Sequence, residues 1–249
     1  MRAIAVAKKD LRELPGYFKI SIIILPATII FLAAVLILAA GSPEAISEMP
    51  SIPPSVFPPG LTDLERSLYF YLNFMILPFF LMLATILPVT IAADAFAGER
   101  ERKTLEALLA VPMSNRDLFL GKALLPLSYG FGSSLVAFVI ITLIVKLSFP
   151  NAAISMPNAS WLILIFLAVP AFSLLGILAE LIISSRVDRT YYAVQIGSLV
   201  MLPLLVFVFG GVTGFLLLGP LLLLILSAVV FLLDYILMQI GSDYLAKGI

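Results

Sequence analysis

Residues 98–122 read Gly-Glu-Arg-Glu-Arg-Lys-Thr-Leu-Glu-Ala-Leu-Leu-Ala-Val-Pro-Met-Ser-Asn-Arg-Asp-Leu-Phe-Leu-Gly-Lys. The first part of this stretch, residues 98–112, is called the charged loop below. It is rich in ionised side chains, whereas the flanking stretches 69–93 and 119–145 contain only one, Lys122. Charged side chains at this density need water, and apolar stretches of this length can cross the hydrocarbon core of a bilayer. The pattern predicts a hydrophilic loop between two membrane-spanning helices.

Composition places the chain among integral membrane proteins, because 62% of its 249 residues are hydrophobic, 12% are charged and the mean hydropathy is +1.15. Six continuous apolar runs are long enough to span a bilayer: Phe18–Ala40, Tyr69–Ala93, Phe119–Leu147, Trp161–Ser184, Tyr191–Phe209 and Phe215–Gln239. A β-barrel would need short alternating segments instead. The sequence therefore predicts an all-α membrane protein, in which residues 1–249 form a single six-span domain.

The basic residues predict how the chain is oriented in the membrane. If the N-terminus is cytoplasmic, Arg66 and Lys146 are the two basic residues outside, which leaves 13 of the 15 lysines and arginines in cytoplasmic segments. We therefore expect a multi-pass protein of the plasma membrane with both termini in the cytoplasm. The first apolar run is too long for the core of a cleaved signal peptide, so we expect it to be retained. The net charge of zero gives no reason to expect a nucleic-acid partner.

Residues 1–15 precede the first span and place Ile4, Ala7, Leu11 and Leu14 at helical spacing among charged side chains. This pattern predicts a helix lying in the membrane interface, although a plain charged tail is the alternative.

Two loops outside the membrane are also informative. Residues 41–68 are rich in proline and should be extended, with a possible short helix near Leu61–Arg66. Residues 210–214 contain three glycines. A tight turn is the favoured interpretation of that segment, and a close approach of backbones or a re-entrant dip is the alternative.

The charged loop is predicted to be an amphipathic helix that ends at Pro112, before Ser114 and Asp117 begin the third span. Its apolar face holds Leu105, Leu108 and Leu109, and its ionic face holds Glu99, Arg102, Lys103 and Glu106. Glu99 and Lys103 have the spacing of an ion pair one helical turn apart. Such a helix should lie parallel to the membrane, with its leucines toward the bundle and its charges toward a partner. An ordinary solvated loop is the alternative.

The loop also carries a motif. The run Glu101-x-x-Thr104-Leu105-Glu106-x-Leu108-Leu109-x-x-Pro112-x-Ser114, with Gly121-Lys122 following, resembles the signature of ABC-2 type permeases, the transmembrane subunits of ABC transporters. Lys103 departs from the pattern, since many members of that family carry glycine before the threonine. The resemblance covers the whole six-span plan with its N-terminal interfacial helix.

The resemblance implies that residues 98–112 are a coupling helix, which fits a cleft on a separate ATPase subunit. The residues that would contact this subunit are Glu99, Arg100, Arg102, Lys103, Leu105, Glu106, Leu108 and Leu109. The family plan also implies two permease protomers, identical or paralogous, and two ATPase subunits in the lipid bilayer. The chain would then move an unidentified substrate, which we expect to be a small amphiphilic or apolar molecule, an ion or a lipid that is exported.

The chain itself shows no signature of an enzyme. It has no Gly-x-x-x-x-Gly-Lys-Ser/Thr phosphate loop, and without histidine or cysteine it has no metal-hydrolase motif. We therefore expect no catalytic residue, no metal site and no cofactor on this chain, with ATP and Mg bound by the partner ATPase subunit. The alternative function is an ATP-independent secondary transporter or channel, which usually shows repeats and broken helices that this sequence lacks.

Polar residues inside the spans indicate a substrate path or helix contacts. The candidates for the path are Asn73, Thr85, Thr90, Tyr191, Gln195 and Ser198. Hydrogen bonds between helices are an equally good interpretation of these six residues. Three acids, Asp94, Glu180 and Asp234, lie near the predicted cytoplasmic ends of their spans. For these acids we favour pairing with Arg186, Arg189 or Lys19 over a proton or ion relay.

Overall fold

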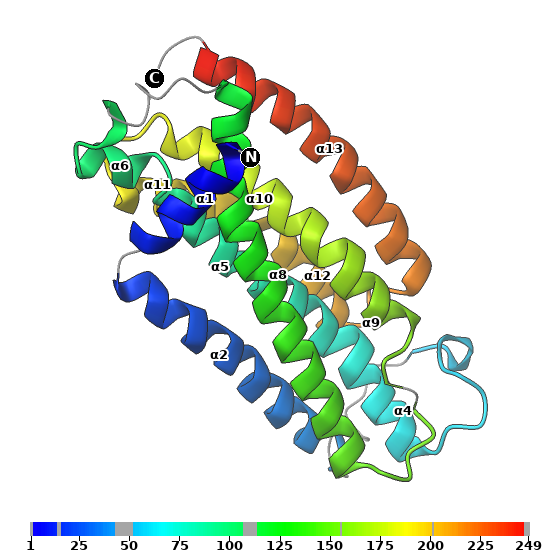
Figure 1. Cartoon of the computed structure of the whole chain (residues 1–249). Helices are drawn as coiled ribbons and strands as arrows, with labels where there is room; N and C mark the ends of the chain where they lie inside the picture. The colour runs from blue at the N-terminus through cyan, green and yellow to red at the C-terminus, as the bar shows by residue number, and fades with distance from the viewer. Residues whose placement is uncertain are drawn as a thin grey trace.

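The structure is a computed structural model that describes residues 2–13, 16–42, 52–106, 114–154, 156–200 and 202–246. Within these ranges every regular element is helical, which confirms the all-α prediction (Figure 1). The long helices of the bundle are α2 (Gly16–Ala40), α5 (Leu77–Ala93), α8 (Asn115–Ser148), α10 (Val169–Ser184), α11 (Thr190–Val200), α12 (Leu202–Val212) and α13 (Pro220–Ala246).

Four helical segments of the described residues are long and apolar enough to cross a membrane, or five if the bent pair α11 and α12 is one span. The four are Asp63–Glu101, Arg116–Ser148, Ala159–Ser184 and Pro220–Gly241. The predicted first span is helical as α2, of which Pro26–Ala40 counts as a shorter apolar helix. A multi-pass membrane protein is thus supported, while the number six stays a prediction.

The second predicted span is the longest helical segment. It begins with α4 (Asp63–Phe70), continues through the π-helical turn η2 (Tyr71–Ile76) into α5, and ends with the short helix α6 (Ala97–Glu101). Thr62 caps α4, because its hydroxyl accepts from the Glu65 amide while the Glu65 carboxylate accepts from the Thr62 amide at 2.8 Å. This capping box places the start of the helix inside the loop where a short helix was expected.

Helix α10 occupies the centre of the bundle and packs against α5, α8, α11 and α13. It follows α9 (Ala159–Ile163) and the π-helical turn η3 (Leu164–Ala168). Near the start of this span Trp161 is fully buried, with its ring 5.5 Å from that of Phe80 and 5.8 Å from that of Phe138. The core is therefore a continuous apolar interior that joins three spans.

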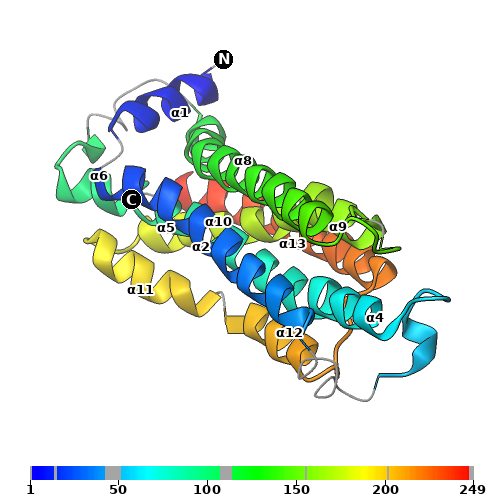
Figure 2. The same ribbon diagram turned by 90° about the horizontal axis from the view of Figure 1, so that it is seen from below.

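Helix α1 (Arg2–Glu13) lies beside α8 at one end of the bundle, together with α6; we call this the ionic end (Figures 1 and 2). Its buried side chains are Val6 and Ala7, whereas Ile4 and Leu11 are exposed. The predicted helix is therefore present, with Ala7 of the stripe packed inward and Ile4 and Leu11 on its exposed surface, and its place in the membrane interface stays a prediction. Leu14 of that stripe lies outside the described residues.

The glycines near residue 211 do not form only a tight turn. Helix α12 continues to Val212, and the turn comes at Gly214, whose φ is +69°. Gly211 is buried within α12, and a Cβ added there would lie 2.0 Å from the carbonyl oxygen of Phe74 in η2. The close approach of backbones, which was the less favoured interpretation, therefore occurs between α12 and η2.

Helix α13 begins five residues after the predicted start of its span. Phe215 lies before the helix and is 90% exposed. Pro220 is the first residue of α13, a position that suits proline because the first helical amide has no partner within the helix.

Candidate functional site

The charged loop is not one continuous helix. Helix α6 ends at Glu101, and Lys103 adopts the left-handed conformation with φ +57°. The Thr104 amide donates to the Glu99 carbonyl at 2.9 Å and the Lys103 amide donates to the Arg100 carbonyl at 3.0 Å. These two bonds are the Schellman pattern that ends a helix, in which the left-handed residue is usually glycine. The prediction of a single helix over 98–112 is therefore wrong at Lys103.

Helical structure resumes at Leu105 and Glu106. Leu105 is buried, as predicted, in an apolar cluster with Val6, Phe96 and Leu118. The predictions for Leu108, Leu109 and Pro112 fall on residues 107–113, which lie outside the described part of the chain.

Glu99 lies inside the bundle and not on a solvent-facing surface. Its side chain is 1% exposed, and its carboxylate accepts hydrogen bonds from Lys9 at 2.5 Å, from Lys122 at 3.2 Å and from the hydroxyl of Thr104. The predicted pair with Lys103 does not form, because the left-handed turn rotates Lys103 away. The prediction that Glu99 belongs to an exposed ionic face is therefore wrong.

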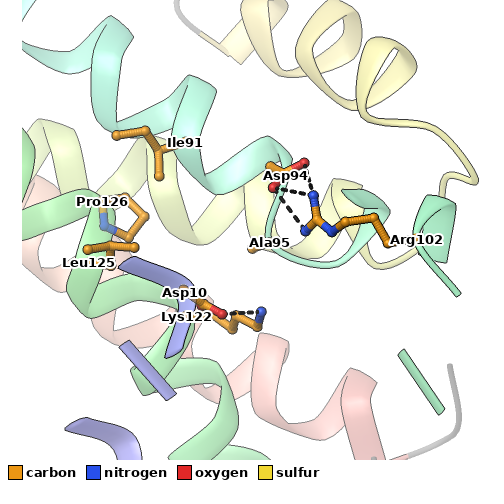
Figure 3. A pocket seen from close by; sticks show the side chains of 8 residues that line it. All are labelled: Asp10, Ile91, Asp94, Ala95, Arg102, Lys122, Leu125 and Pro126. Carbon is orange, nitrogen blue, oxygen red and sulfur yellow. Dashed lines mark hydrogen bonds and ion pairs between the residues drawn. The ribbon is translucent and has the colours of Figure 1, made fainter. Parts of the chain in front are cut away.

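Lys122 connects this carboxylate to a second acid. Its ammonium group lies 3.0 Å from Asp10 Oδ1 and 5.9 Å from the ring centre of Phe96, and its side chain is 1% exposed (Figure 3). Burial raises the pKa of Asp10, and the neighbouring charge of Lys122 opposes that rise. We call Lys9, Asp10, Glu99 and Lys122 the Glu99 cluster. With all four groups ionised its net charge is zero, which satisfies the requirement that buried charges be paired.

Two other charges of the loop bind the connection between α10 and α11. Arg100 donates to the carbonyl of Val187 at 2.8 Å and to that of Ser185 at 3.0 Å, just past the end of α10. Glu101 accepts from the amide of Thr190 at 2.9 Å, at the first residue of α11. A cation at a helix C-terminus and an anion at a helix N-terminus both complement the helix dipole.

Asp94 is paired within its own segment. Arg102 binds its carboxylate through two nitrogens at 3.1 Å (Figure 3). The hydroxyl of Thr190 also donates to it, at 3.3 Å. A cavity of about 20 Å³, large enough for a single water, separates this pair from Asp10 and Lys122.

The other two intramembrane acids have no such partner. Glu180 is fully buried and Asp234 is 3% exposed, and none of their carboxylate oxygens has a hydrogen bond among the described residues. Asp94 is therefore paired, although with Arg102 and not with a predicted partner. Among the described side chains Glu180 and Asp234 do not show the expected pairing, and the side chain of Lys19, one expected partner, lies outside those described.

The remaining charges of the described part of the loop, Lys103 and Glu106, are exposed, and so is Arg102 in part. These side chains agree with the predicted ionic face. The loop thus has one set of charges, Glu99, Arg100 and Glu101, that binds four helices, although Glu101 is itself exposed, and a second, exposed set at its tip.

Two of the six candidate path residues line a common groove. A cavity of about 270 Å³ lies between α5 and the pair α11 and α12, lined by Met82, Ile86, Val89, Thr90, Val194, Ser198, Leu202 and Leu205. Thr90 and Ser198 each donate their hydroxyl proton to a carbonyl of their own helix, at 2.8 and 2.7 Å. The groove is therefore largely apolar.

The other four path residues lie elsewhere. Tyr191 and Gln195 are exposed on α11 outside the groove. Thr85 is buried and donates to the Met82 carbonyl. Asn73 is buried in η2, where its amide oxygen accepts from Asn158 at 2.8 Å. For Asn73 the structure favours a hydrogen bond between segments, the alternative interpretation of the sequence.

The roles of Lys9, Asp10, Glu101 and Lys122 were not predicted from the sequence. One signal was available, since Lys122 is the single charge in the apolar stretch 119–145 and an isolated charge there requires a partner. Its partners are 23 and 112 residues away in the sequence, and no local pattern identifies them.

Residues 4–239 of the chain match a family described as ABC-2 family transporter protein. The chain is also similar to the ABC transporter permease protein NatB of Bacillus subtilis (strain 168), with 31% identity over 118 residues. This alignment covers 42% of the chain and 29% of that relative, so the chain matches less than a third of the relative's length.

Proposed function

The chain belongs to the ABC-2 family of transporter proteins and is thus a membrane subunit of an ABC transporter, and on this premise we propose that a separate ATPase subunit drives it through the charged loop. In this proposal the ionic end of the bundle faces the cytoplasm, where ATP and Mg are bound by the ATPase. The excess of lysine and arginine at that end supports the orientation.

The observation that carries the proposal is the division of the charges in the loop. Glu99 binds α1 and α8, Arg100 binds the end of α10, and Glu101 binds the start of α11. A displacement of α6 therefore strains contacts to four helices at once. Lys103 and Glu106 remain exposed, with opposite charges, for a partner to bind. A loop that only joined two spans would not need charged contacts to four helices.

The groove between α5 and the pair α11 and α12 is the proposed substrate path. It is apolar and open on one side, so a second permease protomer placed against it would enclose a channel. The exposed side chains of Tyr191 and Gln195, on the same helix as Ser198, would then face that protomer. A groove of this character fits a small amphiphilic or apolar cargo, and we propose that it is exported.

The proposal is tested by ATP turnover. The purified chain is assayed alone and together with the ATPase encoded by a neighbouring reading frame, in the same detergent. We expect no turnover from the chain alone, because it contains no phosphate loop, and a stable complex whose turnover depends on both subunits. Turnover by the isolated chain, or failure of any ATPase to copurify, would contradict the proposal.

A further inference from the structure

A second groove lies on the opposite side of α8 from the centre of the bundle, between α2 and α8. Its volume is about 630 Å³, and its walls include Pro26 and Ala27 of α2 and Tyr129 and Gly132 of α8. The two helices meet farther along, where Ile37 and Ile141 share one apolar cluster, and they diverge toward the ionic end (Figure 1). The groove occupies the part where they diverge.

The lining of this groove has few hydrogen-bonding groups that are free to bind water. The hydroxyls of Ser128 and Ser133 donate to the carbonyls of Leu125 and Gly130, at 2.8 and 3.1 Å. At Gly132 an added Cβ would meet no atom within 4 Å, so the groove is open at that residue. The Tyr129 phenol is the one other polar group among the lining residues, so the wall is largely apolar.

The depth of the groove places it in the hydrocarbon. Gly132 lies ten residues beyond Lys122 in α8, which corresponds to about 15 Å along the helix axis. Helix α8 is one of the segments long and apolar enough to span a membrane. An apolar groove on the outer side of a spanning helix at this depth faces the hydrocarbon chains of the lipid.

Helix α1 packs against α8 next to one residue of the groove wall, Tyr129. Ala7 of α1 packs in one apolar cluster with Leu125 and Tyr129 of α8. Lys8 and Arg12 are exposed and lie one helical turn apart on α1, and Arg12 comes four residues before the start of α2. The exposed Ile4 and Leu11 suit a helix at the membrane surface. Basic side chains at such a surface attract anionic lipid headgroups.

We propose that an anionic phospholipid binds here, with one acyl chain in the groove between α2 and α8 and its phosphate at Lys8 and Arg12. Because α1 also carries Lys9 and Asp10, the bound lipid fixes the helix that supplies half of the Glu99 cluster. Lipid composition thereby controls how firmly α1 is held against the charged loop. This inference goes beyond the proposed function and depends on the membrane setting of α8, not on the ATPase.

The test measures which lipid the chain retains. The chain is reconstituted into vesicles of phosphatidylglycerol and phosphatidylcholine in equal amounts, released into detergent, and examined by native mass spectrometry. The wild-type chain should retain about one phosphatidylglycerol in preference to phosphatidylcholine. Each basic side chain contributes about fivefold to such a preference, so K8Q/R12Q should reduce it by up to roughly 30-fold. Lys146→Gln, an exposed lysine at the other end of α8, is the matched control.

A second pair of variants tests the acyl chain. Gly132→Leu and, from the other wall, Ala27→Leu place a side chain in the groove, and both should abolish lipid retention while leaving the unfolding transition unchanged. Ala27 is exposed and the space at Gly132 is open, so neither change crowds the core. The inference is overturned if K8Q/R12Q keeps the wild-type preference, or if both groove variants retain the lipid. Neither result affects the ATPase proposal, because no ATPase is present.

Discussion

Replacement of Lys122 by methionine removes the charge at the centre of the Glu99 cluster and keeps an unbranched side chain of similar length. The Lys122 ammonium lies 3.0 Å from Asp10 and 3.2 Å from Glu99, and both Lys122 and Glu99 are 1% exposed at the side chain. Loss of one partner from a buried ion pair costs about 3–5 kcal/mol of unfolding free energy. Glu99 keeps Lys9 and Thr104, so we expect the lower end of that range.

A loss of about 3 kcal/mol shifts the unfolding equilibrium by roughly 100-fold. The assay is denaturant unfolding of the chain in detergent, followed by the emission of Trp161, the single tryptophan, which is fully buried. Lys146→Met, on the exposed far end of the same helix, is the control and should change the unfolding free energy by less than about 0.5 kcal/mol. Adding Asp10→Asn to Lys122→Met should recover part of the loss, because it neutralises the acid that has lost its partner.

We also expect the effect of Lys122→Met on the free energy of unfolding to depend on pH. Burial raises the pKa of Asp10 above its ordinary value of 3.8, so the folded chain holds this proton to a higher pH than the unfolded chain does. The stability contributed by the neutral acid is therefore present at low pH and is lost as the pH rises between the two pKa values. Without Lys122 to oppose it, the rise in the pKa of Asp10 should be larger. The loss of unfolding free energy in Lys122→Met, relative to the wild type, should therefore become smaller as the pH falls. If Lys122→Met unfolds like the wild type at every pH, the buried cluster is refuted.

Three further predictions concern local geometry and topology. Lys103→Gly should raise the unfolding free energy by about 0.5–1 kcal/mol, because glycine adopts the left-handed conformation at φ +57° without strain; a decrease would refute the helix-ending turn. Gly211→Ala should lower it by about 1–3 kcal/mol, because the new Cβ would meet a backbone oxygen at 2.0 Å, while Gly219→Ala, with nothing within 4 Å, should leave it unchanged. A cysteine at Asn151 should react with an impermeant maleimide on intact cells and a cysteine at Ser114 should not; the opposite labelling would invert the proposed orientation.

The helices could be predicted from the sequence because long apolar runs have few alternatives in a membrane. The run Phe119–Leu147 appears as α8, Asn115–Ser148, and starts early because Ser114 caps it. Its hydroxyl accepts from the Asp117 amide, which is the local signal that the sequence contained. The start of α13 was predicted less well. Hydropathy places the start of the apolar run at Phe215, but it does not show that the helix begins at Pro220.

The candidate site was harder to predict because its bonds join residues that are far apart. Helical periodicity placed Glu99 on one face with Lys103, but the left-handed turn at Lys103 ends the helix before that face is completed. Lys9, the partner of Glu99, is 90 residues away in the sequence. Only the packing of α1 against α8 brings these groups together. All six path candidates were chosen by polar spacing, and of these Thr90 and Ser198 line the groove whereas Tyr191 lies outside it. Polar spacing alone does not tell which side of a helix is covered.

We propose that the exposed tip of the charged loop binds the ATPase, whereas Glu99, Arg100 and Glu101 hold the permease together. A pull-down of the ATPase subunit with K103E/E106K, run beside the unfolding of the same variant, separates these two roles. Both side chains are exposed, so unfolding followed by Trp161 should match the wild type. Reversed charges facing a complementary partner cost several kcal/mol, so recovery of the complex and its ATP turnover should both fall sharply. If the variant recovers the ATPase and turns over ATP at wild-type levels, the tip is not the docking surface of this permease.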